Sequence, residues 1–80
     1  MMKAFVEIHL KKGVADPEGA NTLKALKLLG FENAVDVKSA KLFEIDLEGE
    51  DKDEARKILE EMCNRLLANP VIHDYMIRFE

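Results

Sequence analysis

Few residues of this sequence have the types and spacing that catalysis, metal binding or phosphate binding requires. Its single cysteine, Cys63, excludes an internal disulfide, and no Cys-x-x-Cys pair or His/Cys cluster supplies ligands for zinc. Gly13 and Gly19 stand alone and form no phosphate loop, and no Ser-His-Asp set stands out. The acidic run at residues 48–54 lacks the residue order of a calcium loop and fits a solvated loop with a helix cap. We therefore expect no catalytic, cofactor-binding or metal-binding residues in this chain.

Length and charge narrow the class of protein further. Eighty residues form one domain, residues 1–80, and a domain of this size buries only about 60% of its unfolded surface. Disulfides, a metal or a partner usually stabilise so small a chain, and here a partner remains. The net charge of −4, from 12 basic and 16 acidic residues, argues against nucleic-acid binding. Without a membrane-length apolar run or a signal-peptide pattern, we expect a cytoplasmic protein with no membrane segment.

Periodic patterns predict four strands and two helices. Asp16 is expected to cap the first helix, with Pro17 at its first position, and Gly30 ends it. The second helix begins after Asp51 and ends before Pro70. Period-two alternation predicts strands, at residues 2–11, 34–38, 41–48 and 71–79.

The order of these elements predicts the fold. Strand, helix, strand, strand, helix and strand make a ferredoxin-like βαββαβ arrangement, an α+β two-layer sandwich. In this fold a four-stranded antiparallel sheet carries two helices on one face, and the first and third strands are central. Ser39-Ala40 would form the hairpin between the second and third strands, although it is a weak turn signal.

The other face of the predicted sheet has no helix, yet it carries apolar side chains. These could be scattered surface residues. The marginal size of the domain favours a contact surface instead. An unpaired edge strand is also ready to pair with a second chain. We therefore expect self-association through four residues, which are Phe5, Leu42, Ile72 and Met76.

Three stretches of the sequence resemble one protein family. Residues 12–19, KGVADPEG, resemble the pattern K-x-G-V-x-D-P-E-G with one spacer missing, and residues 28–31, LLGF, resemble its helix end. Residues 66–75, LLANPVIHDY, are similar to the signature L-L-A-N-P-V-I-E-D-Y. The chain is thereby identified as a member of the PurS family, the small subunit of phosphoribosylformylglycinamidine (FGAM) synthase. It departs from the family at Ala40, where a hairpin R-x-G-K has glycine, and at His73, where glutamate is usual.

This resemblance implies a subunit without catalysis of its own, in a ligase complex of purine biosynthesis. A glutaminase subunit of the complex releases ammonia from glutamine. A large synthetase subunit uses ATP and Mg to convert formylglycinamide ribonucleotide to its amidine. The small subunit, as a homodimer or tetramer, would bridge the two and assist ammonia transfer, and would bind no cofactor itself.

The residues expected near the partner subunits all have simpler interpretations. Lys41 could be only solvated, Asn69 only a helix end, Tyr75 a core residue and His73 a hydrogen-bonded, half-buried histidine. We expect contacts with partners at these four positions, Lys41, Asn69, His73 and Tyr75.

One function of a different class stays open. A small-molecule-binding regulatory domain of the ACT type shares this order of strands and helices and also dimerises through its edges. A saturable thermal shift with an amino acid or a nucleotide would favour that interpretation.

Overall fold

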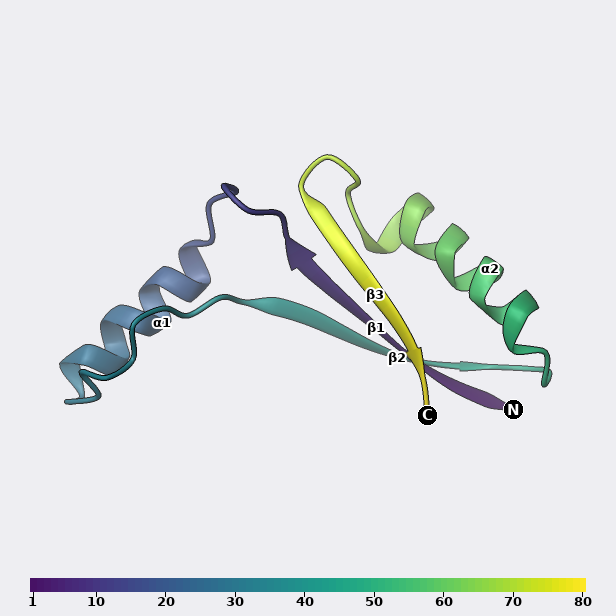
Figure 1. Ribbon diagram of the computed structural model, residues 1–80, viewed down its shortest axis with the longest axis horizontal. Helices are drawn as coiled ribbons and strands as arrows, with labels where there is room; N and C mark the ends of the chain where they lie inside the picture. Colours follow the sequence, from purple (N-terminus) through teal and green to yellow (C-terminus); the bar gives the residue numbers. More distant parts are fainter.

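The computed structural model describes all 80 residues and shows an elongated α+β chain (Figure 1). Its elements, in chain order, are β1 (Met2–Leu10), α1 (Pro17–Leu28), β2 (Ala40–Leu47), α2 (Lys52–Met62), the π-helical turn η1 (Cys63–Leu67) and β3 (His73–Phe79). Neither helix combines the length and the apolar character that crossing a bilayer would require.

The sheet has three antiparallel strands in the order β2-β1-β3. Central strand β1 pairs along nearly its whole length with both neighbours, so that Val6 lies opposite Phe43 on β2 and Ile77 on β3. The two-residue period of a strand then places alternate side chains of all three strands on the same face.

One face of this sheet holds the core, and α2 covers it. Val6, Leu59 and Cys63 are fully buried there. Half-buried residues of β2 and β3 pack around this cluster, among them Phe43, Ile45, Leu47, Tyr75, Ile77 and Phe79. Only 8 of 80 residues are buried, so the core is small even for a chain of this length. A second chain is the natural source of further burial.

Both helices begin as their sequences predict. The Asp16 carboxylate accepts the amide hydrogen of Gly19, and the Asp51 carboxylate accepts the amide hydrogens of Asp53 and Glu54. Each cap satisfies backbone donors that the first turn of a helix leaves without partners.

Helix α1 does not lie on the sheet. It extends to one end of the molecule, far from β1, β3 and α2, and makes no extensive contact with them (Figure 1). The molecule measures 48 × 26 × 14 Å and has a radius of gyration of 16.0 Å. A compact domain of this length would have a radius of gyration of about 12 Å. We call residues 11–39, which include α1 and the extended return segment, the arm.

The predicted four-stranded sheet with both helices on one face is therefore wrong, although the α+β class is correct. Residues 34–38 are extended but form no strand, because no neighbouring strand is available to hydrogen-bond with them. The chain also makes no hairpin at Ser39-Ala40. Ala40 instead begins β2 opposite His9, so that the return segment leads directly into the sheet.

Two predicted boundaries near the end of the chain also shift. The second helix is α-helical only to Met62 and continues as the π-helical turn η1, which leaves Leu66 83% exposed. The last strand begins at His73 and not at residue 71, because residues 69–73 form a hydrogen-bonded turn.

Candidate functional site

An apolar hollow lies beside α2 on the helix-covered side of the sheet. Its volume is about 340 Å³, and the ion pair between Glu61 and Arg65, with a 3.0 Å separation, stands at its rim. Its apolar lining consists of Ile45, Ile58, Met62, Leu66 and Leu67. Such a lining offers no general acid or base, but it suits an apolar helix face.

The arm carries uncovered apolar side chains of its own. Leu28 is 84% exposed, Leu29 and Phe31 follow it at the tip, and Val35 on the return segment is 86% exposed. Large apolar side chains gathered in one segment are a sign of an interaction surface.

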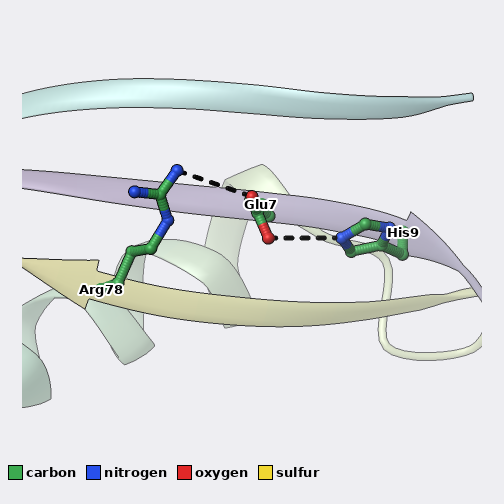
Figure 2. A network of polar contacts seen from close by, with 3 residues as sticks. All are labelled: Glu7, His9 and Arg78. Atoms are coloured by element: carbon green, nitrogen blue, oxygen red, sulfur yellow. Dashed lines mark ion pairs between the residues drawn. The ribbon is translucent and has the colours of Figure 1, made fainter.

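The helix-free face of the sheet carries an ionic network centred on Glu7 (Figure 2). One carboxylate oxygen of Glu7 lies 3.6 Å from Nε2 of His9, and the other lies 3.6 Å from Nη2 of Arg78. The Arg78 guanidinium also stacks over the Phe5 ring at 4.6 Å from its centroid. These polar groups engage one another across β1 and β3, and the exposed apolar side chains beside them suit this face to contact with another chain.

A second ion pair on this face joins β1 to β2. Nζ of Lys3 lies 2.7 Å from a carboxylate oxygen of Glu44. The hydrogen bond to Glu44, with the attraction of its charge, raises the pKa of Lys3.

Of the four residues expected to mediate self-association, three gather on this face. Leu42 and Met76 lie on either side of Glu7 in the strand register, and both are exposed. Phe5 lies two residues from Glu7 on the same strand. Ile72 is not part of this group, because it lies in the turn before β3, where its carbonyl accepts the amide hydrogen of Lys11.

The four residues expected near partners are more widely spread. Lys41 is exposed on β2 and forms no ion pair. Asn69 and His73 share the turn after η1. His73 and Tyr75 both line a second hollow, which has a volume of about 400 Å³. Tyr75 is half-buried against the core, and burial raises the pKa of its hydroxyl group, which keeps it neutral.

Sequence reasoning missed one polar arrangement, between the two ends of the arm. Asp16 was expected only to cap α1, but its carboxylate also accepts two hydrogen bonds from Ser39, 23 residues later. The hydrogen bond from the Gly19 amide, followed by the two from Ser39, holds the pKa of Asp16 below its ordinary value. No local pattern could reveal a contact across this distance in the sequence.

Comparison with known proteins establishes the family. The family model of PurS, described as phosphoribosylformylglycinamidine (FGAM) synthase, matches residues 3–80. The chain belongs to the PurS family. PurS is the small subunit of FGAM synthase, so the family inferred from the three sequence motifs is confirmed.

Curated members of the PurS family match along nearly their whole length. The chain is 51% identical over 80 residues to FGAM synthase subunit PurS of Methanocaldococcus jannaschii, covering 100% of this chain and 96% of the relative. It is 55% identical over 76 residues to the subunit of Archaeoglobus fulgidus, covering 95% of each.

Solved PurS structures share the extended shape. The crystal structure of M. jannaschii PurS aligns with a TM-score of 0.91 at 50% identity, covering 100% of this chain and 96% of the other. A chain in the structure of PurLQS from Thermotoga maritima aligns with a TM-score of 0.90 at 25% identity, covering 99% and 96%. The displaced arm is thus compatible with the conformation of other PurS chains.

Proposed function

We propose that this chain bridges the glutaminase and synthetase subunits of FGAM synthase as a homodimer or tetramer, and performs no chemistry itself. The observation that carries the proposal is the arm, whose apolar side chains find no surface of their own chain to cover. Both the apolar side chains of the arm and the hollow beside α2 are left uncovered. Such a chain needs other chains to complete its core. The similarity to a chain of T. maritima PurLQS supports the same role.

The missing cover for the hollow is best supplied by the arm of a second copy. In a ferredoxin-like fold the first helix would lie beside the second on the same face of the sheet, where this chain has its hollow. The arm carries five Lys against four Asp or Glu, for a net charge of +1, whereas the remaining residues carry a net charge of −5. Opposite charges favour docking of one copy's arm on the other copy's body. We infer a dimer that exchanges α1 reciprocally.

In the complex, a rigid bridge of this kind would assist transfer of ammonia from the glutaminase to the synthetase. Ammonia that becomes protonated in bulk water is no longer a nucleophile, so the two subunits must be held in contact. ATP and Mg would be used by the large subunit, and this chain would bind neither. Cys63 is a free thiol, as is usual in the reducing cytoplasm, where we propose that the complex acts.

Reconstitution with the glutaminase and synthetase subunits tests the proposal. Glutamine-dependent amidine formation should require this chain, whereas formation supported by ammonium chloride should persist without it. Full glutamine-dependent activity of the two larger subunits alone would contradict the proposal. Light scattering of the isolated chain should give at least twice the monomer mass of 9.1 kDa.

A thermal-shift titration of the isolated chain separates this role from that of an ACT-type regulatory domain. ATP with Mg²⁺, other nucleotides and amino acids should leave the melting temperature unchanged. A saturable increase with one of them would instead favour a small-molecule sensor.

A further inference from the structure

The helix-free face of the sheet has an apolar centre. Phe5, Leu42 and Met76 lie around Glu7 in the middle of the three strands, and Leu42 and Met76 are 56% and 59% exposed. The exchanged dimer proposed above covers the opposite face, where the hollow beside α2 lies. The dimer therefore leaves this centre exposed in both copies, and apolar side chains gathered on one exposed face mark a contact surface.

Polar contacts hold the side chains around this centre in place. The Arg78 guanidinium lies 4.6 Å from the centroid of the Phe5 ring and 3.6 Å from the Glu7 carboxylate (Figure 2). On the β2 side, Nζ of Lys3 lies 2.7 Å from the Glu44 carboxylate. Because these side chains are already ordered, the face loses little conformational entropy when it binds another surface.

The charges left without a partner on this face are negative. Its two bases, Lys3 and Arg78, each lie against a carboxylate. Two further acids of the face, Asp46 and Asp74, are exposed and form no ion pair within the chain. With four acids and two bases on the paired strands, and His9 counted as neutral, the face has a net charge of −2.

These two carboxylates lie at opposite corners of the face. Asp46 on β2 lies opposite Lys3, near one end of β1, and Asp74 on β3 lies opposite His9, near the other end. Six residues separate Lys3 from His9, which corresponds to about 20 Å along a strand. The face thus combines an apolar centre with a charged rim, as protein interfaces do.

A second copy of the chain fits this surface poorly. In a twofold contact between two identical faces, each copy would bring the same net negative charge and no free base. Like charges that face each other across an interface are unfavourable. A surface that carries Lys or Arg around an apolar patch would instead pair with Asp46 and Asp74.

We propose that the helix-free face binds a larger subunit of the complex, at an apolar patch on that subunit bordered by Lys or Arg side chains. The proposal rests on the bridging function proposed above and names the surface through which the bridge is attached. It assigns to a larger subunit three residues for which the sequence predicted self-association, Phe5, Leu42 and Met76.

Charge reversal at both corners of the face tests the proposal. Asp46→Lys combined with Asp74→Lys should raise the concentration of this chain that gives half-maximal glutamine-dependent activity about tenfold, because two attractive charge pairs become repulsive. Added salt should weaken assembly of the unmodified chain more than assembly of this variant. The matched control is Glu50→Lys with Glu60→Lys, which changes the total charge equally in the turn before α2 and on α2 and should leave the half-maximal concentration unchanged.

The mass of the isolated chain tests the alternative occupant, a second copy. Light scattering should give the same mass for the charge-reversal variant, the control and the unmodified chain. A mass that changes in the charge-reversal variant alone would assign the face to a second copy and overturn the proposal. A half-maximal concentration equal to that of the control would also overturn it.

A milder pair of substitutions covers the case in which charge reversal prevents folding. Asp46→Asn with Asp74→Asn removes both charges at nearly constant side-chain size and should raise the half-maximal concentration about threefold. No increase in this variant would overturn the assignment of the face. Glutamine-dependent activity that does not need the unmodified chain would instead overturn the bridging function, so the two failures are distinguishable.

Discussion

Asn69 and His73 hold each other through two hydrogen bonds. The Asn69 amide hydrogen is donated to Nδ1 of His73 at 2.9 Å, and the His73 amide hydrogen is donated to the Asn69 carbonyl at 2.8 Å. The Asn69 side chain also accepts the amide hydrogen of Val71. Histidine, at a position where the family pattern has glutamate, thus closes the turn that leads from η1 into β3.

Replacing this imidazole should loosen the turn. His73→Ala should lower the free energy of unfolding by about 1 kcal/mol, because the Asn69 amide hydrogen loses its acceptor. Urea denaturation measures the difference. Asp74→Ala, at the exposed neighbouring residue, should change stability by less than about 0.5 kcal/mol. Equal effects of the two substitutions would show that the His73 hydrogen bond contributes nothing.

Local sequence patterns were sufficient for the elements that the chain stabilises by itself. The alternation around Val6 and the caps at Asp16 and Asp51 each predict an element that the structure contains. These elements depend on neighbours a few residues away or on one shared core.

The arm could not be predicted in this way. Val35 and Val37 alternate as a strand does, but a strand also needs a hydrogen-bonded neighbour, and none is present in the chain. The contact between Asp16 and Ser39 and the π-helical turn at η1 likewise depend on tertiary structure. The sequence therefore predicts helix α1 of the arm correctly, but the expectation that this helix packs on the sheet is wrong.

The hollow beside α2 should not tolerate a charge. Leu66→Asp would place a carboxylate against the arm of a second copy, and an unpaired buried charge costs several kcal/mol. Light scattering should show dissociation of the dimer to the 9.1 kDa monomer. The matched control is Val71→Asp, since Val71 is 78% exposed and lies outside the hollow. Dissociation in both variants, or in neither, would contradict docking of the arm at this place.

Lys41 remains a predicted contact with the larger subunits. Lys41→Glu should weaken assembly with them about fivefold, as expected from loss of an ion pair of about 1 kcal/mol, because this lysine is free of partners within the chain. Titration of glutamine-dependent activity with the variant measures the effect, and the mass of the isolated variant should not change. Lys57→Glu, on the exposed side of α2, is the control for a general effect of charge.

Cys63 should behave as a core residue and not as a reactive thiol. It is fully buried at the start of η1, and burial raises the pKa of its thiol, so both access and thiolate formation are suppressed. A disulfide exchange reagent should modify the folded protein far more slowly than the urea-unfolded chain. Similar rates in the two states would show that η1 opens readily and exposes the core.

Acid should weaken the arm as Asp16 becomes protonated. The pKa of Asp16 lies below its ordinary value of 3.8 because the Gly19 amide and Ser39 donate hydrogen bonds to its carboxylate. Stabilisation by this group is complete above pH 3.8 and is lost as the pH falls through the lower pKa of the folded state. Asp16→Asn retains an oxygen acceptor and cannot titrate, so its urea midpoint should fall less steeply below that pH. Thr22→Ala, which also alters α1 but leaves Asp16 in place, should keep the steep acid loss. If Asp16→Asn followed the same acid profile as Thr22→Ala, protonation of Asp16 would not be the source of the acid sensitivity.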